Sequence, residues 1–347
     1  MKVNNISISQ VTPPFIIAEM SGNHNQSLDN ALKIVEKAAL AGVQAIKLQT
    51  YTADTMTINC SSQDFLIKDE NSLWNGENLY DLYNKAHTPW EWHKQIFDKA
   101  SALGLVCFSS PFDESAVDFL EELNNPLYKI ASFEFTDIPL IKKVISTKKP
   151  VILSTGMATF SEISEVVELL KTSSTEFALL KCTSAYPATV EDANILTIPD
   201  LRLNFGCEVG LSDHTIGIGA SLAAISHGAS IIEKHFTLSR SDGGVDSKFS
   251  MEPHEMENLA IEAKNVWKSL GKPTYGTTKN DSKSKIFRRS IYAIKDILIG
   301  EVLSKNNVGV IRPSYGLEPK FLNKVIGQKA SRDIAKGTPI NWDLIEK

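Results

Sequence analysis

Residues 208–238 read EVGLSDHTIGIGASLAAISHGASIIEKHFTL and contain one complete strand–helix–strand unit. The runs at 208–214 and 230–238 predict two strands, and the small and apolar residues after Gly219 predict the helix that joins them. Strands that alternate with helices in this way indicate an α/β fold with a parallel sheet. Each of the two predicted strands also carries a histidine near its end, His214 and His235.

The same alternation continues along most of the chain. Six further strand-like runs begin at Phe15, Ala45, Leu105, Tyr128, Val151 and Phe177, and helical patterns separate them, among them 27–42 and 89–104, with a last one at 254–271. Eight such units in about 250 residues predict a closed (β/α)8 TIM barrel. An open doubly wound sheet is the alternative, because periodicity does not show that a sheet closes.

The chain of 347 residues is expected to contain two domains. Residues 1–271 form the predicted barrel, and the polar stretch 272–284, KPTYGTTKNDSKS, is typical of a linker. Residues 285–347 carry short strand-like runs between turns and predict a small, mostly β domain with little helix. The connection from Tyr51 to about Thr88 is unusually long, and connections of this length are typical of lids and binding loops.

Composition excludes several classes of partner. The chain has 41 acidic and 36 basic side chains, so neither nucleic acid nor an anionic membrane surface is expected as a partner. It has no uninterrupted apolar stretch of spanning length and no apolar segment at its amino terminus, so neither insertion into a membrane nor secretion is expected. The four cysteines lie far apart, without the spacing of a zinc module, and are expected to be reduced thiols of a cytoplasmic protein.

Polar residues gather near the ends of the predicted strands. They include Glu19, Lys47, Ser110, Lys129, Ser132, Ser154, Lys181, Ser184, Ser212, His214, Glu233 and His235. Because the carboxyl ends of barrel strands form the face that carries active sites, these residues predict an active site there. Lysines and hydroxyls can bind a phosphate or carboxylate, and two histidines on adjacent strands can share a divalent cation.

Each of these residue types also has a purely structural interpretation. A single lysine near a strand end commonly extends to solvent, and a single histidine on an apolar strand is commonly a hydrogen-bonded core residue. Three lysines on barrel strands favour a ligand-binding role, because lysine is rarely buried without a partner. His93, in the pattern at 89–104, is expected at the surface.

Several motifs occur in the order found in the sialic acid synthase family. They are AEMSGNHNQS, IKLQTY, FSSPF, YKIAS, ILSTGMAT, KCTSAYP, VGLSDHT and IEKHFTL, followed in the tail by SIYAIKDILIGE, IRPSYG and IGQKASRDIAKGTPI. The chain therefore resembles this family, whose members condense phosphoenolpyruvate with an amino sugar. The resemblance implies a TIM barrel followed by a small antifreeze-like (SAF, β-clip) domain.

Other segments bear on the sugar. YTADTMT, LYDLYNKAHTPWEWH, KIASFE, KCTSAYP and DSKFS resemble the branch that uses a diacetamido-trideoxy-altrose. The branch that makes N-acetylneuraminate more often has a histidine before Cys182 and a Pro-Asp-His run in place of Val245, Asp246 and Ser247. N-acetylneuraminate and legionaminic acid synthases remain alternatives with the same chemistry. A Schiff-base aldolase that uses Lys181 is a further alternative.

The resemblance also implies a role for each candidate residue. The substrates are phosphoenolpyruvate and an amino-sugar aldehyde, and His214 and His235 hold a divalent metal cation, Mn²⁺, Mg²⁺ or Co²⁺. Glu19 handles protons. The implied substrate-binding residues are Lys47, Lys129, Ser132, Ser154, Ser184, Tyr186, Ser212, Asp246 and Arg312. At position 184 the family often has Asn. Arg312, in the antifreeze-like domain, is implied to reach the barrel of a second chain in a domain-swapped homodimer.

Overall fold

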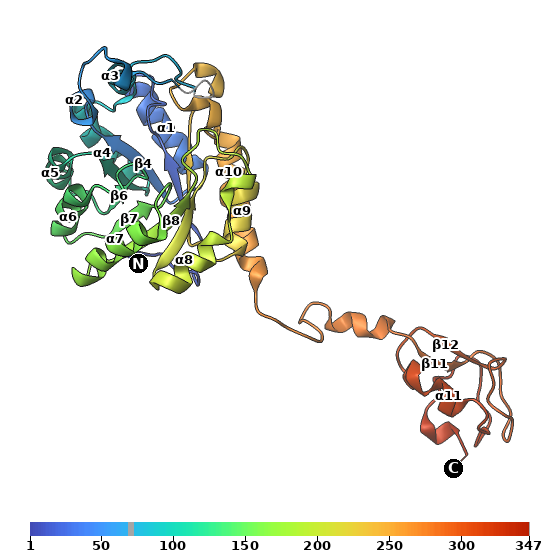
Figure 1. Ribbon diagram of the computed structural model, residues 1–347. Helices are drawn as coiled ribbons and strands as arrows, with labels where there is room; N and C mark the ends of the chain where they lie inside the picture. Colours follow the sequence, from blue (N-terminus) through green and yellow to red (C-terminus); the bar gives the residue numbers. More distant parts are fainter. Residues whose placement is uncertain (69–72, 347) are drawn as a thin grey trace. The chain divides into compact units, whose positions relative to one another are not determined.

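The computed structural model describes residues 1–68 and 73–346. The chain forms two compact units, Met1–Gly271 and Lys272–Lys347. The first unit is a closed barrel of parallel strands with helices around it (Figure 1). None of the helices in the described ranges is long and apolar enough to cross a membrane.

Eight parallel strands form the barrel, at the places that the sequence predicts. They are β3 (Phe15–Glu19), β4 (Ala45–Thr50), β5 (Val106–Pro111), β6 (Tyr128–Ile130), β7 (Val151–Ser154), β8 (Phe177–Cys182), β9 (Glu208–Ser212) and β10 (Ile231–His235). Each strand pairs with the next one along the chain, and β10 pairs with β3 from Ile231↔Phe15 to His235↔Glu19. This last pairing closes the sheet, so the predicted TIM barrel is confirmed and the open-sheet alternative is wrong.

One main helix follows each barrel strand. These helices are α1 (Leu28–Leu40), α4 (His93–Ala102), α5 (Glu114–Glu122), α6 (Ile138–Ser146), α7 (Phe160–Thr172), α8 (Thr197–Phe205), α9 (Gly219–Ser226) and α10 (Pro253–Leu270). Local sequence sets several starts, because Ser27 and Asp113 accept hydrogen bonds from the first free amides of α1 and α5, and Thr159 forms a capping box with Glu162. Short 3-10 helices also lie in the connections, among them η2 (Trp90–Trp92), η3 (Glu191–Ala193), η4 (Arg240–Asp242) and η5 (Ser247–Phe249).

Two apolar cores hold this unit together. Phe15, Ile17, Phe108 and Leu180 belong to a cluster inside the barrel. The larger cluster lies between the strands and the helices and takes the alternate strand residues, such as Leu179. Successive side chains of a strand point to opposite faces, so membership of these clusters shows which face each strand residue occupies.

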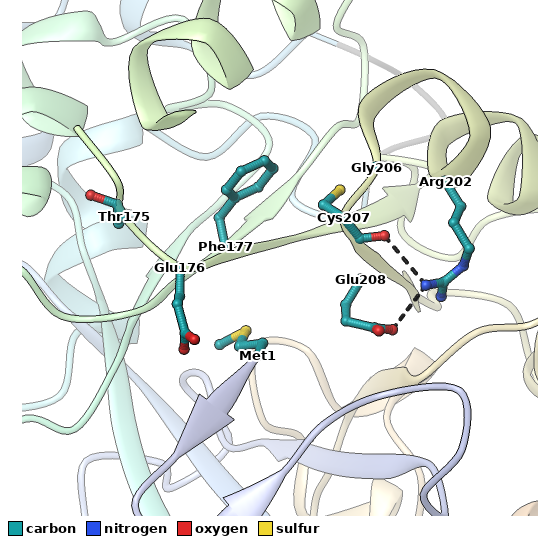
Figure 2. A pocket seen from close by; sticks show the side chains of 8 residues that line it. All are labelled: Met1, Thr175, Glu176, Phe177, Arg202, Gly206, Cys207 and Glu208. Atoms are coloured by element: carbon teal, nitrogen blue, oxygen red, sulfur yellow. Dashed lines mark hydrogen bonds and ion pairs between the residues drawn. The ribbon is translucent and has the colours of Figure 1, made fainter. Parts of the chain in front are cut away.

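A two-stranded hairpin precedes the barrel, and the sequence analysis does not predict it. It consists of β1 (Lys2–Val3) and β2 (Ile6–Ser7), and Val3 packs in the interior cluster. A hollow of about 510 Å³ lies beside Met1, lined by residues that precede or begin β8 and β9 (Figure 2). Arg202 donates there to the carbonyl of Cys207 and the carboxylate of Glu208. This hollow is at the amino ends of the strands, opposite the predicted active site.

Short helices occur in the described parts of the long connection after β4. It contains α2 (Ala53–Met56), η1 (Gln63–Phe65) and α3 (Leu79–Ala86). Asn78 starts α3 by accepting a hydrogen bond from the amide of Tyr80. Trp74 donates from Nε1 to the carbonyl of Val245, at 3.2 Å, so this connection reaches the loop after β10.

The second unit is small and built around a pair of antiparallel strands, β11 (Ser290–Ala293) and β12 (Val308–Ile311). Its other elements are η6 (Ser282–Phe287), η7 (Pro319–Phe321), α11 (Leu322–Val325) and η8 (Trp342–Leu344). Ile291, Leu303, Val325 and Ile340 are part of its own apolar core. The regular strands are shorter than the sequence predicts, because part of the backbone pairing here occurs through isolated bridges.

Candidate functional site

Side-chain alternation decides which polar residues face the barrel interior. Phe15, Ile17, Phe108 and Leu180 belong to the interior cluster, and the inward positions that follow them toward the carboxyl ends are polar. These positions are Glu19, Lys47, Ser110, Lys129, Ser154, Cys182, Ser212, Glu233 and His235, all of them buried. The structure therefore brings most of the sequence-predicted residues together at one end of the barrel.

Two lysines and two glutamates form the centre of this group. Lys47 Nζ lies 2.5 Å from Glu19 Oε2 and 3.8 Å from Glu233 Oε2, and Lys129 Nζ lies 3.7 Å from Glu233 Oε1. Burial lowers the pKa of Lys47, but the charges of Glu19 and Glu233 outweigh it and raise this pKa overall. Burial keeps the pKa of Lys129 below its ordinary value despite Glu233. Burial opposes ionisation of Glu233, yet Lys129 and Lys47 hold its pKa below the usual range.

Hydroxyl groups surround the lysines. Lys129 Nζ donates to Ser154 Oγ at 2.7 Å, Lys47 Nζ donates to Ser110 Oγ at 3.3 Å, and Ser212 Oγ donates to Glu233 Oε1 at 3.0 Å. On the same face the amide of Gly156 donates to Ser132 Oγ at 3.2 Å. Two ammonium groups with several hydroxyls and an amide form a cradle suited to a small anion with many oxygens.

Gly156 is the point where Ser132 and Ser184 converge. A methyl group at this glycine would overlap Ser184 Oγ and would lie 2.6 Å from Ser132 Oγ. The absence of a side chain therefore lets hydroxyls from two connections approach the backbone after β7. Any larger residue at this position would require the side chains of Ser132 and Ser184 to move.

The two predicted metal ligands lie next to each other, with ring centroids 5.3 Å apart. His214 Nδ1 is 2.8 Å from the carbonyl oxygen of Thr183, so it must carry a proton, and Nε2 remains available as a ligand. His235 Nδ1 is 3.4 Å from Asp246 Oδ2 and, within the described chain, has no hydrogen-bond partner. Burial lowers the pKa of His214, but the neighbouring Cys182 raises it overall.

The donor set fits a cation only in part. Among residues 1–68 and 73–346, no group of three or more His, Cys, Asp and Glu side chains is arranged to hold a metal ion. Two imidazoles on adjacent strands nevertheless suit a first-row divalent metal, and the remaining positions would belong to water or substrate oxygen. The unpartnered Nδ1 of buried His235 also agrees with a missing ligand.

Aromatic side chains enclose the histidines. Tyr186 lies against His214, with centroids 4.4 Å apart, and Phe249 lies 4.9 Å from His235. Trp74, from the long connection, is 6.0 Å from Tyr186. Asp246 is buried beside these rings and accepts a short hydrogen bond from Ser21. A ligand bound at the histidines would therefore contact the rings of Tyr186 and Phe249 and the carboxylate of Asp246.

The sequence profile of the NeuB family matches residues 34–275, and that of the SAF domain matches residues 288–346. The chain belongs to the NeuB family. Pseudaminic acid synthase of Helicobacter pylori is 44% identical to it over 337 residues, which cover 96% of this chain and 98% of the relative. The predicted sialic acid synthase resemblance is thereby confirmed.

Two NeuB relatives from one Campylobacter jejuni strain differ in similarity. Its pseudaminic acid synthase is 45% identical over 93% of this chain and 94% of its own length. Its N,N'-diacetyllegionaminic acid synthase is 35% identical over 92% of this chain and 96% of its own length. Among solved structures, N-acetylneuraminic acid synthetase of Leptospira borgpetersenii in complex with citrate has a TM-score of 0.73 and 31% identity, covering 82% of this chain and 94% of that one.

The structure adds residues to this NeuB site that the sequence analysis does not assign. Glu134 lies in the loop after β6, its Oε2 is buried, and that atom has no hydrogen-bond partner in the described part of the chain. Burial raises the pKa of Glu134 to about 7. Although burial raises the pKa of Cys182, its hydrogen bond with His214 lowers this pKa to about 6. The inward register of Cys182 could have been inferred from strand alternation, whereas Glu134 follows no such pattern.

The positions of Lys181 and His93 differ from what the sequence analysis leads one to expect. Lys181 is on the outward register of β8 with Leu179, and its Nζ donates to the carbonyl of Cys182 and the hydroxyl of Thr183. This position argues against a Schiff-base role. The expectation of a surface His93 is wrong, because this side chain is fully buried and its Nε2 lies 2.8 Å from Thr50 Oγ1. The buried face of α4 requires this orientation.

Arg312 belongs to the second unit and directly follows β12. It lines a hollow of about 630 Å³ there, together with Arg288 and Arg289. Three guanidinium groups make this hollow suitable for an acidic partner. The predicted role of Arg312 at a barrel stays a prediction.

Proposed function

We propose that this NeuB-family enzyme condenses phosphoenolpyruvate with 2,4-diacetamido-2,4,6-trideoxy-L-altrose and water, giving pseudaminic acid and phosphate. The observation that carries the proposal is the buried group of Glu19, Lys47, Lys129 and Glu233 at the carboxyl end of the barrel. The higher identity to pseudaminic acid synthases than to a legionaminic acid synthase favours this sugar over the alternatives.

Phosphoenolpyruvate would bind in the cradle of lysines and hydroxyls. Its phosphate and carboxylate need cationic and hydrogen-bonding partners, and Lys47 and Lys129 provide the charge. The hydroxyls assigned to this role are Ser132, Ser154, Ser184 and Ser212. In the free enzyme Glu19 and Glu233 neutralise the lysines, so the buried ammonium groups keep their charge until an anion arrives.

The reaction forms one carbon–carbon bond and breaks one carbon–oxygen bond. The enol carbon attacks the aldehyde carbon, and water then adds to the cationic carbon that bears the phosphate ester. The tetrahedral adduct expels phosphate and becomes the 2-keto acid. Glu19, whose Oε1 accepts the amide of Ser21 and whose Oε2 contacts Lys47, is positioned to take or return a proton through Oε2.

His214 and His235 would hold Mn²⁺, Mg²⁺ or Co²⁺. A bound divalent ion supplies Lewis-acid polarisation of the aldehyde oxygen. The chain's contribution is to keep one imidazole nitrogen of His214 free, since the carbonyl of Thr183 binds the other. Asp246 lies beside His235 and is assigned to the hydroxyls of the sugar.

The aromatic surroundings support a 6-deoxy sugar. Trp74, Tyr186 and Phe249 offer apolar ring faces near the histidines, and a terminal methyl group is favourably buried against such faces. The hydroxymethyl group of N-acetylmannosamine would lose water there without gaining a partner. This argument favours the pseudaminic and legionaminic acid branches over the N-acetylneuraminate branch. The choice between the pseudaminic and legionaminic branches rests on sequence identity.

A homodimer is part of the proposal, as is a cytoplasmic location, where phosphoenolpyruvate is made. In this dimer Arg312 of one chain would complete the site of another. Mixing a Glu19→Gln variant with an Arg312→Ala variant tests the arrangement, because hybrid dimers would contain one intact site. Activity that exceeds the sum of the two separate variants supports it, and simple additivity contradicts it.

The decisive experiment is phosphate release from phosphoenolpyruvate with a panel of amino sugars, with and without added Mn²⁺. Turnover with the diacetamido-trideoxy-altrose and little with N-acetylmannosamine or the legionaminic precursor is expected. Preference for either of the other sugars would reassign the branch. Covalent trapping by borohydride would instead support the Schiff-base alternative.

A further inference from the structure

We infer that the buried ion pair between Asp213 and Lys234 positions His214 and His235 relative to each other. Asp213 directly precedes His214, and Lys234 directly precedes His235. Lys234 Nζ lies 3.0 Å from Asp213 Oδ2, and each side chain is 1% exposed. The inference rests on the proposed metal-binding role of the two histidines.

The pair is behind the barrel wall and cannot touch substrate. His235 has the inward register of Glu233, so its neighbour Lys234 points outward. On β9 the outward register belongs to Val209 and Leu211, and Asp213 continues it. Ser221 of α9 donates to Asp213 Oδ2 at 2.6 Å, which places the pair between the strands and this helix. Asp213 and Lys234 are therefore positioning residues rather than catalytic ones.

Every hydrogen-bonding position of the pair is used. Besides Asp213, Lys234 Nζ donates to the carbonyl of Thr215 at 2.7 Å and to the carbonyl of Gly217 at 2.9 Å. Asp213 Oδ1 accepts the amide and the hydroxyl of Thr215 at 2.9 and 2.8 Å. Together these bonds fix the backbone on both sides of His214 and join it to the strand that carries His235.

Stability alone gives little reason for this arrangement. Ala18, the residue paired with Lys234 in the sheet, is apolar, and so are most outward positions of the barrel strands. Replacing a buried ion pair by apolar residues is often neutral or stabilising, because charges lose hydration when they are buried. The specific effect of the ion pair is to hold the ends of the adjacent strands β9 and β10 at a fixed distance from each other.

That geometry matters because few polar groups in the described chain restrain either imidazole. The His214 ring contacts the carbonyl of Thr183 and the thiol of Cys182, and the nearest polar group to His235 Nδ1 is the carboxylate of Asp246 at 3.4 Å. A shift of one strand end would change the separation of the two imidazoles. Groups that orient metal ligands typically contribute about 10- to 100-fold in metal affinity.

The test uses the full-length double variant Asp213→Asn/Lys234→Met, which removes both charges without leaving one buried alone. Calorimetric titration of the metal-free protein with Mn²⁺ should show at least about tenfold weaker binding. The KM for phosphoenolpyruvate should stay within about twofold, because the lysine cradle is unchanged. A second double variant, Asp213→Asn/Lys234→Gln, also removes both charges and keeps polar groups for the carbonyls of Thr215 and Gly217, so it should fold if the first does not, with a smaller loss of Mn²⁺ affinity.

A matched control lies at the other end of the same strand. Arg202 Nη1 is 2.9 Å from Glu208 Oε2, at the start of β9 (Figure 2). The double variant Arg202→Met/Glu208→Gln should lower the melting temperature but leave Mn²⁺ affinity unchanged. Equal Mn²⁺ affinity in the parent and in the folded Asp213 and Lys234 variants would overturn the positioning role of the ion pair but not the metal-binding role of the histidines. A parent that binds no Mn²⁺ would overturn the metal role and the inference with it.

Discussion

Glu19 and Lys47 lie on neighbouring strands in direct register, and their charged groups are 2.5 Å apart inside the barrel. Glu19 Oε2 has the Lys47 ammonium as its charge partner, so transfer of a proton to this carboxylate would be coupled to weakening of the ion pair. The pair thereby links the carboxylate proposed for proton transfer with an ammonium proposed for phosphoenolpyruvate.

Replacement of Glu19 by Gln should therefore affect turnover more than binding. The amide keeps the shape and can still accept the amide of Ser21, but it cannot take a proton. We expect kcat to fall by about 10²- to 10⁴-fold, the usual contribution of a general acid or base. Steady-state kinetics with unchanged circular dichroism would establish this result. A fall of less than about fivefold would remove Glu19 from proton transfer.

Replacement of Gly156 by Ala should weaken phosphoenolpyruvate binding. The new methyl group would overlap Ser184 Oγ and crowd Ser132 Oγ, so these hydroxyls must move. We expect the KM for phosphoenolpyruvate to rise at least about tenfold, or about 1.4 kcal/mol. Gly219→Ala is the matched control, because nothing lies within 4 Å of the position of its methyl group. Equal KM values for the two variants would contradict the cradle.

Replacement of either His214 or His235 by Ala should abolish metal-dependent turnover in a folded protein. Chelation of the parent enzyme with EDTA should have the same effect, and Mn²⁺ should restore activity only to the parent. The exposed His227, at the end of α9, provides the control, and its Ala variant should match the parent. Full activity after rigorous chelation would refute the assignment of both ligands.

Replacement of Glu134 by Gln should change how stability depends on pH. Burial raises the pKa of Glu134 from the ordinary 4.5 to about 7. Between these values the folded chain keeps a proton that the unfolded chain has lost, so this group destabilises the fold as pH rises through the window. At pH 8 the variant should be more stable than the parent by about 3 kcal/mol, and at pH 4 the two should be equal.

Denaturant unfolding at the two pH values measures that difference. Glu165→Gln, an exposed carboxylate on α7, is the matched control and should leave the pH dependence of the parent unchanged. Identical pH profiles for the Glu134 variant and the parent would show that this carboxyl is ionised in the folded protein at the same pH as in the unfolded chain.

The barrel could be predicted from sequence because its signal is periodic. Runs such as 231–235 combine β-branched residues with inward polar groups, and a helix pattern separates each run from the next. The hairpin β1–β2 could not be found, since two residues per strand are too few for a periodic pattern. Its position follows from tertiary packing of Val3 into the barrel interior.

The candidate site also contains some residues that sequence can predict and others that it cannot. Lys47, Lys129 and His235 stand out in sequence because they interrupt apolar strands near their ends. Glu134 lies in a loop without period, and only the fold reveals that its carboxylate is buried. His93 illustrates the opposite error, because its position on a helix did not reveal that this face packs against Thr50.

Most of the residues proposed for the chemistry and most of those proposed for sugar choice lie on different kinds of segment in this barrel. Glu19, Lys47, Lys129 and His235 are all on strands whose register is fixed by closure of the sheet. Trp74, Tyr186 and Asp246 are all in the connections that follow β4, β8 and β10. The connection after β8 also carries Thr183 and Ser184, which hold His214 and belong to the lysine and hydroxyl cradle. We therefore expect that exchanging only the connections after β4 and β10 with those of a relative would leave the reacting groups in place while changing the surface that meets the sugar.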